Sequence, residues 1–379
     1  MPLRILVVFG TRPEAIKLAP VISALAAHQN VRLSVCNSGQ HQELLNNILQ
    51  WFDIEADHSL DVMSHGQSLT NTYAKILQGV TRVIEQEKPD IVVVQGDTLT
   101  TLAAAQAAYL SQIKVAHVEP GLRTYDAQSP WPEEGNRRMM ASITNFHFAP
   151  TERARHHLLQ EFIPPESIFL TGNTVVDALR QVLTKLDADS QVRQQVQDRY
   201  PFLASARRLV LVTAHRRENF ATGLDELKAA LLRLAEHFAD SIQIVLPVHK
   251  NPVVSDSLRH GLSDIESVHL IEPQDYVGFV FLMSRAALII TDSGGVQEEA
   301  PSLGVPTIVT RQGTERSEGL EGYGVYLIPP IASDIYDTAV RLLDQPAPAR
   351  EVSNEVVNPY GDGLAGQRIA DILSQSIPK

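Results

Sequence analysis

The sequence predicts an α/β protein made of two domains, each built on a parallel β-sheet. Short apolar runs rich in β-branched residues alternate with longer amphipathic stretches along nearly the whole chain, which is typical of parallel strands joined by right-handed helical crossovers. The runs are continuous, as expected for strands that are covered on both faces. The predicted strands are Ile5–Phe9, Ile91–Gln95, Val115–Val118, Ile168–Leu170, Leu209–Thr213, Ile242–Leu246, Val268–Ile271, Leu288–Thr291 and Thr307–Val309.

The same alternation divides the chain. Helical periodicity occurs between the strands, for example at Leu69–Ile84, Leu224–Phe238 and Ile335–Leu343. At 379 residues the chain is too long for one ordinary core, and the alternation restarts after a polar, strand-poor stretch at Leu186–Arg208. We place the hinge near Gly172, and so predict an N-terminal domain over 1–172 and a C-terminal domain over 173–363.

Composition excludes several classes of protein. Hydrophobic residues make up 44% and charged residues 20%, the profile of a soluble globular protein, and no stretch approaches the roughly 20 apolar residues of a membrane span. A formal net charge of -12 argues against nucleic-acid and acidic-membrane partners. Cys36 is the only cysteine, which excludes an internal disulfide and a cysteine-based zinc site. The run Ile5–Phe9 lacks a signal-peptide cleavage site, and we expect a cytoplasmic protein.

The charged clusters of unusual composition follow directly after predicted strands, where open α/β sheets bind their ligands. Two such domains facing each other would form a cleft lined by these loops. In the first cluster, Gly10 ends a strand and Pro13 suits the first turn of a helix. Helix N-termini attract anions through free N–H groups, and Arg12 and Lys17 would add positive charge. The alternative is a strand–helix corner with two solvated cations.

Carboxylates follow two further strands. Asp97 closes the run Ile91–Val94 and could simply cap the next helix. Glu119 lies at the end of another strand. Two carboxylates at neighbouring strand ends can share a site, where crowding raises the pKa of at least one of them, and general acid–base chemistry uses this arrangement.

A further predicted helix begins at Pro132, after a rigid Pro-Trp-Pro approach. The pairs Glu133/Arg137 and Glu134/Arg138 are spaced i,i+4, so two weak surface salt bridges are one interpretation. A rigid approach is costly for a solvated helix, and we favour a functional segment.

The predicted C-terminal domain carries two more clusters. His215 follows the strand Leu209–Thr213 and could donate a proton or contact a phosphate near neutral pH. His215 and His249 could together bind a metal, but no carboxylate is spaced from them as in a metal-ligand motif, so no metal site is predicted. In the strand–turn–helix segment Asp292–Ala300, two glycines let backbone N–H groups approach a phosphate, and Glu299 can take two ribose hydroxyls. The spacing fits neither a P-loop nor Gly-x-Gly-x-x-Gly, which argues against kinases and dehydrogenases.

The distribution of cations indicates the charge of the ligand. The chain is acidic overall, yet many cations lie in strand-end segments, which favours an anionic small ligand and above all a phosphate. These cations are Arg12, Lys17, Arg123, Arg137, Arg138, Arg216, Arg217 and Arg316.

Several of these segments together resemble the non-hydrolysing bacterial UDP-N-acetylglucosamine 2-epimerases, in chain order and over essentially the whole sequence. They are Gly10–Lys17, Gly96–Thr98, Ser129–Glu134, His215–Asn219 and Asp292–Glu299, with Asn358–Gly363 near the end. The resemblance implies a GT-B-type fold of two facing Rossmann-like domains with an active-site cleft between them, and a homodimer. It also implies that a last helix, 364–379 at most, packs back on the first domain, and that no cofactor is needed.

The resemblance implies a reaction and site residues as well. The C2 proton of UDP-N-acetylglucosamine is removed as UDP leaves C1; the glycal-like intermediate regains a proton on its other face and re-adds UDP, giving UDP-N-acetylmannosamine. The implied catalytic residues are Asp97, Glu119, Glu133, Arg137 and His215. The implied substrate contacts are Arg12, Lys17, Asp97, Glu119, His215, Gln274, Phe279, Ser293, Gly294, Gly295, Glu299 and Arg316.

Small departures from the family's pattern leave other substrates and classes open. Pro120 stands where a small residue is commoner, Ala214 where Gly is more usual and Ser317 where Pro is frequent. One alternative is a 2-epimerase of a modified sugar nucleotide such as UDP-2,3-diacetamido-2,3-dideoxy-glucuronate. Another is a GT-B glycosyltransferase, which would not need three carboxylates together. A hydrolysing epimerase and a non-catalytic nucleotide-sugar sensor complete the set.

Overall fold

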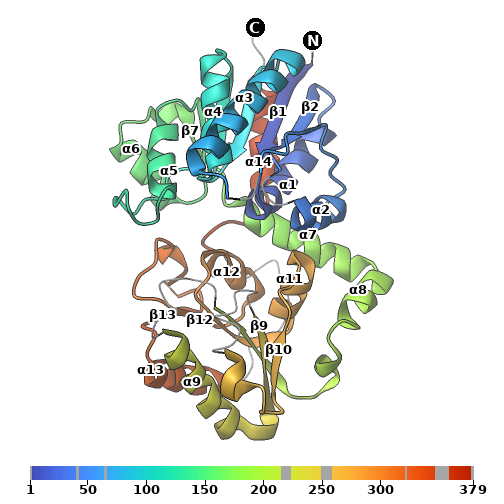
Figure 1. Ribbon diagram of the computed structural model, residues 1–379, viewed down its shortest axis with the longest axis vertical. Helices are drawn as coiled ribbons and strands as arrows, with labels where there is room; N and C mark the ends of the chain where they lie inside the picture. Colours follow the sequence, from blue (N-terminus) through green and yellow to red (C-terminus); the bar gives the residue numbers. More distant parts are fainter. Residues whose placement is uncertain are drawn as a thin grey trace. The chain divides into compact units, whose positions relative to one another are not determined.

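The computed structural model describes residues 2–39, 42–63, 66–214, 223–248, 258–320, 322–345 and 358–376 (Figure 1). The chain forms two compact units, one of Met1–Ala178 with Tyr360–Lys379 and one of Leu179–Pro359. The first unit takes in the start of helix α7 (Thr174–Ala188), which the predicted boundary at 172 assigned to the second domain. The chain returns to the first unit just before the predicted last helix.

The first unit is built on a seven-stranded parallel sheet in the order β3-β2-β1-β4-β5-β6-β7. Every run predicted as a strand in this part of the chain forms one, whereas β2, β3 and β6 are not among the predicted strands. The order reverses between β1 and β4, the kind of switch point at which open α/β sheets bind ligands. The strands are β1 (Leu3–Phe9), β2 (Val31–Asn37), β3 (His58–Ser59), β4 (Ile91–Gln95), β5 (Lys114–Val118), β6 (Phe146–Ala149) and β7 (Ile168–Leu170). The helices are α1 (Arg12–Ala27), α2 (Gln42–Trp51), α3 (Leu69–Glu87), α4 (Leu99–Leu110), α5 (Glu133–Ala141), α6 (Glu152–Gln160) and the start of α7.

The first sheet is buried beneath helices, which accounts for its continuous apolar strands. Leu6 of β1 packs in one cluster with Ile76 of α3 and Leu102 of α4. Each such buried side chain stabilises the fold by about 1.5–3 kcal/mol relative to its exposed state. The strand ends are therefore left as the places where polar side chains can gather.

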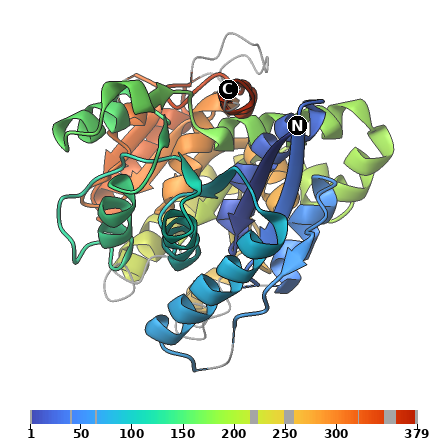
Figure 2. The ribbon, with the colours of Figure 1, turned by 90° about the horizontal axis from the view of Figure 1, so that it is seen from above.

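The C-terminal helix α14 (Ala365–Ser374) packs against α1 in the first unit (Figure 1 and Figure 2). A Cβ on Gly366 would lie 2.8 Å from the carbonyl carbon of Pro20 in α1, so this close approach requires glycine. The Gly366 amide donates to Asp177 Oδ1 at 2.7 Å. The helix therefore ties the end of the chain to its first unit.

Asp177 makes the stability of the first unit depend on pH. Burial raises the pKa of Asp177 to about 6, although amide hydrogen bonds from Gly366 and Ala365 lower it. The folded protein takes up a proton near pH 6 and the unfolded chain near pH 3.8, so acidification between these values favours the folded state. We expect this group to add about 2 kcal/mol to the free energy of unfolding between pH 7 and pH 4, and Asp177→Asn to remove that gain.

Urea unfolding followed by tryptophan fluorescence measures this dependence, because both tryptophans, Trp51 and Trp131, lie in the first unit. Asp90→Asn, in the same unit, is the control. Hydrogen bonds from Arg4 outweigh the effect of burial and lower the pKa of Asp90, so the contribution of Asp90 is lost rather than gained as the pH falls. An Asp177→Asn protein with the wild-type pH dependence would contradict the prediction.

The second unit is built on a six-stranded parallel sheet in the order β10-β9-β8-β11-β12-β13. All its predicted strands form, and β13 is not among them; the order reverses between β8 and β11. The strands are β8 (Arg208–Thr213), β9 (Ile242–Pro247), β10 (Val268–Ile271), β11 (Ala286–Thr291), β12 (Thr307–Thr310) and β13 (Val325–Ile328). The helices are the rest of α7, α8 (Ser190–Gln197), α9 (Gly223–Phe238), α11 (Tyr276–Arg285), α12 (Gly294–Glu299) and α13 (Ala332–Leu343).

Candidate active site

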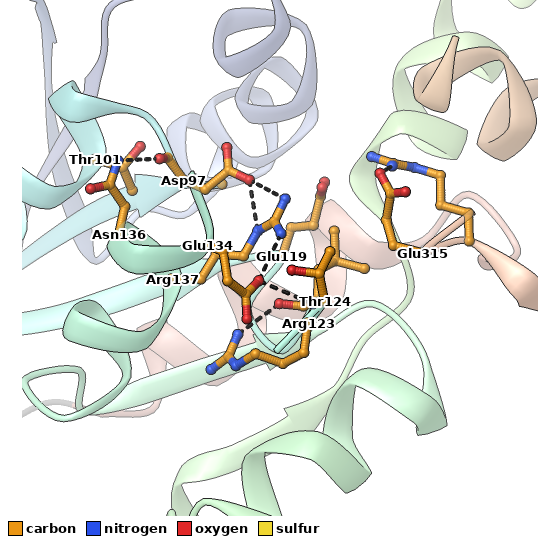
Figure 3. Close-up of polar contacts among 12 residues, drawn as sticks. Asp97, Thr101, Glu119, Arg123, Thr124, Glu134, Asn136, Arg137 and Glu315 are labelled. Carbon is orange, nitrogen blue, oxygen red and sulfur yellow. Dashed lines mark hydrogen bonds and ion pairs between the residues drawn. The ribbon is translucent and has the colours of Figure 1, made fainter. Parts of the chain in front are cut away.

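The turns that follow β1, β4 and β5 lie next to one another at the carboxyl edge of the first sheet, because these strands are neighbours. They carry two of the residues predicted for catalysis, Asp97 and Glu119 (Figure 3). Helix α5 joins the same edge, since Asn136 Nδ2 donates to the backbone carbonyl of Asp97 at 2.7 Å. Polar residues from distant parts of the chain therefore meet here.

The turn after β1 is closed by the carboxylate of Glu14. Its Oε2 accepts the amides of Gly10 and Thr11 at 3.1 and 2.8 Å. Its Oε1 accepts the hydroxyls of Thr98 and Thr101 at 2.8 and 3.0 Å. Burial raises the pKa of Glu14, although these hydrogen bonds oppose the shift. These two amides precede Arg12, the first residue of α1, and Glu14 thereby fixes the turn from which the helix starts.

Lys17 in α1 and Glu119 after β5 form a buried ion pair. Lys17 Nζ donates to Glu119 Oε2 at 2.5 Å, and Gln95 Nε2 donates to the same oxygen at 3.1 Å. The two charged side chains are only 11% and 6% exposed, so Lys17 is not the solvated cation of the alternative interpretation. Glu119 has a φ of 65°, in the left-handed region that costs a non-glycine residue about 1 kcal/mol or more. Such conformations gather at functional sites.

Arg137 in α5 holds the carboxylate of Asp97 (Figure 3). Its Nε and Nη2 both contact Oδ2 of Asp97, at 2.8 and 2.6 Å. Asp97 does not cap α4. The N-cap residue is Thr98, whose Oγ1 accepts the amide of Thr101 at 3.2 Å. The capping interpretation of Asp97 is therefore wrong, and its partly exposed side chain is left at the strand end.

Glu134 is completely buried beside Arg137. Its Oε2 accepts Arg137 Nη1 at 3.2 Å and the Thr124 amide at 3.1 Å, and its Oε1 accepts the Tyr125 amide at 3.1 Å. Neither of the i,i+4 pairs considered for this helix forms among the described residues. The interpretation of two surface salt bridges is therefore wrong, because Asp97 and Glu134 together draw the guanidinium inward.

Two further charged residues near this helix, Glu133 and Arg123, differ in their contacts. Glu133, the first residue of α5, is half-buried, and within the described ranges no hydrogen bond or ion pair engages its carboxylate. Arg123, counted among the cations for a ligand, is buried in a two-pronged pair with Glu161, in which Nε and Nη2 each lie 2.7 Å from an oxygen. That expectation for Arg123 is wrong, because the carboxylate of Glu161 already pairs with its buried guanidinium.

His117 in β5 supports the turn before Asp97 and is not among the predicted residues. Its Nε2 lies 2.7 Å from the carbonyl oxygen of Gly96, which has a φ of 74°. Burial lowers the pKa of His117 to about 3, so the ring is neutral at physiological pH and donates from Nε2. The only signal in the sequence is a polar residue inside an apolar strand.

In the second unit, Arg316 lies against the first residue of α12. A Cβ on Gly294 would be 2.6 Å from Arg316 Nη1, so glycine makes room for the guanidinium. Arg316 Nε donates to Glu298 Oε1 at 2.7 Å, and Nη1 contacts Glu315. A Cβ on Gly295 would meet no atom of the described chain within 4 Å. A side chain at 294 would therefore displace the Arg316 guanidinium, whereas no described neighbour restricts the side chain at 295.

Glu299 at the end of α12 is buried and accepts the Tyr276 hydroxyl at 2.8 Å. Burial, with the adjacent Glu299, holds the pKa of Tyr276 well above its ordinary value, so the hydroxyl stays protonated and donates. Tyr276 begins α11, whose N-cap Asp275 accepts the Gly278 amide at 2.7 Å and pairs with Arg199 at 2.9 Å. The sequence predicted Glu299 but not the donor that orients it.

Two other predicted nucleotide contacts belong to the same part of the second unit. Both ends of the Gln274 carboxamide have protein partners: Oε1 accepts the Tyr200 hydroxyl at 2.7 Å, and Nε2 donates to the Glu272 carbonyl. Phe279 is half-buried in α11.

Comparison with known proteins decides the family. A family profile described as UDP-N-acetylglucosamine 2-epimerase matches residues 23–374. A probable UDP-N-acetylglucosamine 2-epimerase of Ralstonia nicotianae is 47% identical over 366 residues, with 97% of each chain covered. The UDP-N-acetylglucosamine 2-epimerase of Yersinia pestis is 46% identical over 371 residues, with 98% of each chain covered. The chain belongs to the UDP-N-acetylglucosamine 2-epimerase family.

Solved structures of this epimerase family have the same fold. The crystal structure of UDP-GlcNAc 2-epimerase from Neisseria meningitidis bound to UDP-GlcNAc matches with a TM-score of 0.91 at 43% identity, covering 99% of this chain and 100% of that one. An epimerase from Methanocaldococcus jannaschii in complex with UDP-GlcNAc and UDP matches with a TM-score of 0.83 at 33% identity. The predicted family, its GT-B-type α/β fold and its class, isomerase, are therefore confirmed.

The epimerase-family residues predicted for the site fall into three groups. The first unit brings together Lys17, Asp97, Glu119, Glu133 and Arg137 at one sheet edge, with Arg12 half-buried at the start of α1. The second unit places Ser293, Gly294, Gly295, Glu299 and Arg316 around the turn after β11. His215 lies outside the described residues.

In the described ranges, no group of three or more His, Cys, Asp or Glu side chains could hold a metal ion. The described helices also include none that is both long and apolar enough to cross a membrane.

Proposed function

We propose that this chain is a non-hydrolysing epimerase that interconverts UDP-N-acetylglucosamine and UDP-N-acetylmannosamine. The observation that carries the proposal is the carboxyl edge of the first sheet, where Lys17 holds the carboxylate of Glu119 and Arg137 holds that of Asp97. A third carboxylate, that of Glu133, lies at the start of α5. Inversion at C2 requires one group that takes a proton from one face and another that returns a proton to the other face. A relative 43% identical to this chain was solved bound to UDP-GlcNAc.

In the proposed reaction a carboxylate takes the C2 proton while the C1–O bond to UDP breaks. The electron pair of the C–H bond becomes the C1=C2 double bond of a glycal, and the pair of the C1–O bond leaves with the diphosphate. A proton then returns to the opposite face of C2 and UDP adds back to C1. Atoms and electrons balance, so neither water nor a redox partner is consumed.

The charges of the first unit suit this elimination. Arg12 at the start of α1 is proposed to stabilise the departing diphosphate, because cations are most effective where negative charge develops. Lys17 is proposed to keep Glu119 ionised, since an opposite charge at hydrogen-bond distance favours the carboxylate form. His215 is proposed to assist catalysis and to contact the substrate.

The second unit carries the proposed nucleotide contacts. Glu299 is proposed to take the ribose hydroxyls, with Tyr276 holding its other oxygen. Packing does not explain the glycine at 295, which supports a close approach of the diphosphate to the backbone there. The remaining proposed contacts are Gln274, Phe279, Ser293, Gly294 and Arg316.

We also propose that the enzyme is a homodimer of the cytoplasm that supplies sugar nucleotides for cell-surface polysaccharide. Light scattering on the purified protein measures the oligomeric state, and a monomer at micromolar concentration would contradict a dimer.

Proton NMR in deuterated water tests the proposed reaction. Purified protein and UDP-N-acetylglucosamine, without added metal or nicotinamide, are expected to reach an equilibrium with the manno isomer, with deuterium at C2 and little free UDP. Steadily accumulating UDP and free N-acetylmannosamine would favour a hydrolysing enzyme. A protein that binds UDP without conversion or exchange would reject the proposal in favour of a modified sugar nucleotide or of a glycosyltransferase.

Tyr276→Phe is expected to weaken UDP binding by about 10-fold, because Glu299 loses the donor that orients it and a hydrogen bond to a charged group contributes about 1.5–3 kcal/mol. The loss is expected to be smaller for 2′-deoxy-UDP, which lacks one of the hydroxyls that Glu299 would accept. Calorimetric titration of both ligands measures the difference. Tyr336→Phe is the control, since it removes a hydroxyl that is hydrogen-bonded to His237 on the surface of the same unit. An unchanged preference for UDP in Tyr276→Phe would reject this arrangement.

A further inference from the structure

Glu134 is buried beside Arg137 in the candidate site, yet no step of the proposed reaction uses it. It is a charged side chain with no exposure to solvent. Both of its oxygens are engaged, one of them by Arg137 Nη1 (Figure 3). A buried carboxylate in this position is costly unless its partners compensate for the loss of water.

The contact between Arg137 and Asp97 is unsymmetrical. Nε and Nη2 of Arg137 both point to Oδ2 of Asp97, and within the described ranges no hydrogen bond reaches Oδ1. The side chain of Asp97 is 24% exposed, so Oδ1 is the oxygen that a ligand can approach. Guanidinium and carboxylate groups otherwise favour a two-pronged contact that uses both oxygens.

Glu134 fixes the guanidinium that makes this contact. Nη1 of Arg137 donates to Glu134 while Nε and Nη2 face Oδ2 of Asp97, so the plane of the guanidinium is held from both sides. Glu134 is itself held by the amides of Thr124 and Tyr125, so its position is set by the backbone. The main chain of Asp97 is held independently by Asn136. The two carboxylates therefore share one cation in a single, fixed orientation.

We propose that Glu134 is a positioning residue that, through Arg137, presents Oδ1 of Asp97 for proton transfer at C2. The proposal rests on the proposed epimerase function and deepens it, since it names the reacting atom of one carboxylate and the residue that keeps that atom available. Without Glu134, the guanidinium loses the contact that fixes its plane, and Asp97 is no longer held in the orientation that leaves Oδ1 available to the substrate.

Glu134→Gln tests the proposal by steady-state epimerisation. Gln keeps the size of the side chain, but it is uncharged, and its NH2 group would face one of the three N–H groups that Glu134 accepts. The charged contact to Nη1 of Arg137 is therefore weakened. The expected result is a kcat lower by about 10- to 100-fold with KM within about twofold, because misplacement by about 1 Å costs rate rather than affinity. A kcat within about twofold of the wild type would overturn the proposal.

A double-mutant cycle separates positioning from a structural effect. Lys at position 137 keeps the charge but lacks Nη1, so adding Glu134→Gln to Arg137→Lys is expected to cost less than about threefold more in kcat. If the losses in kcat of the two single variants multiply in the double variant, the proposal is overturned. If Glu134→Gln does not fold, Glu134→Asp takes its place in the cycle, because it keeps the charge near the two amides and withdraws it from Nη1.

Glu161→Gln is the matched control. It weakens the partly buried ion pair with Arg123 next to the same loop, but Glu161 contacts neither Arg137 nor Asp97. We expect its kcat to stay within about twofold of the wild type, even if its stability falls. A wild-type protein that does not turn over UDP-N-acetylglucosamine at all would reject the proposed function, whereas active Glu134→Gln beside an active wild type would reject this inference alone.

Discussion

Glu119→Gln is expected to lower the turnover of UDP-N-acetylglucosamine by about 1,000-fold or more while leaving UDP affinity within about threefold. The amide keeps the shape of the side chain but is not basic, so it cannot exchange a proton with C2. The side chain is held by Lys17 and Gln95 at the end of β5, in the first unit, whereas the proposed nucleotide contacts are mostly in the second. Proton transfer is therefore lost and nucleotide binding is not.

The measurement combines NMR of turnover, which detects very slow exchange at C2, with calorimetry of UDP binding. Removing the carboxylate also takes a buried partner from Lys17, so thermal unfolding is followed on the same samples to separate misfolding from lost chemistry. Glu152→Gln is the control, since Glu152 is 69% exposed in a surface pair with Arg155. Wild-type rates in Glu119→Gln would remove Glu119 from the catalytic residues.

Gly121→Ala is expected to destabilise the first unit by about 3 kcal/mol or more, which lowers Tm by roughly 6–12 °C. Gly121 has a φ of 89°, and a Cβ there would lie 2.3 Å from the carbonyl oxygen of Ala154 in α6. A backbone atom cannot move aside as a flexible side chain can. The added methyl group therefore forces the loop away from α6 and displaces Glu119, two residues earlier.

Tryptophan fluorescence during thermal unfolding checks this prediction. Gly135→Ala is the matched control, because Gly135 lies inside α5 and a Cβ there would meet nothing within 4 Å. In that helix, alanine is expected to be neutral or to stabilise by up to about 1 kcal/mol. A Gly121→Ala protein that melts with the wild type would show that α6 yields to the loop.

The predicted strands are those whose burial is visible in their composition. β4, β8 and β11 are continuous apolar runs, because a strand covered on both faces excludes polar side chains. The strand β6 escapes this criterion, since it places His147 between two phenylalanines and buries the imidazole. Burial lowers the pKa of His147 to about 4, so the ring is neutral in the sheet. A histidine in a sequence does not reveal which of its forms is present.

The sequence predicted which residue types form the candidate site, but only some of the contacts between them. Asp97 and Glu119 were predicted because each follows a strand, and parallel strands bring their carboxyl ends to one edge of the sheet. Local spacing suggested i,i+4 partners for Glu133 and Glu134, but Arg137 bonds Asp97 forty residues away and Glu134 only one turn back. The roles of these residues in catalysis remain proposals.

Composition and periodicity were sufficient for the α/β class, the two-part chain and the loops that carry charge, because covering a parallel sheet on both faces demands apolar residues in its strands. They could not pair Lys17 with Glu119, Glu14 with Thr98, or Arg123 with Glu161. Each of these contacts joins elements whose adjacency follows from strand order and helix packing. Strand order is a property of the whole folded sheet, since it minimises the free energy of all strands together, and no local stretch of sequence contains it.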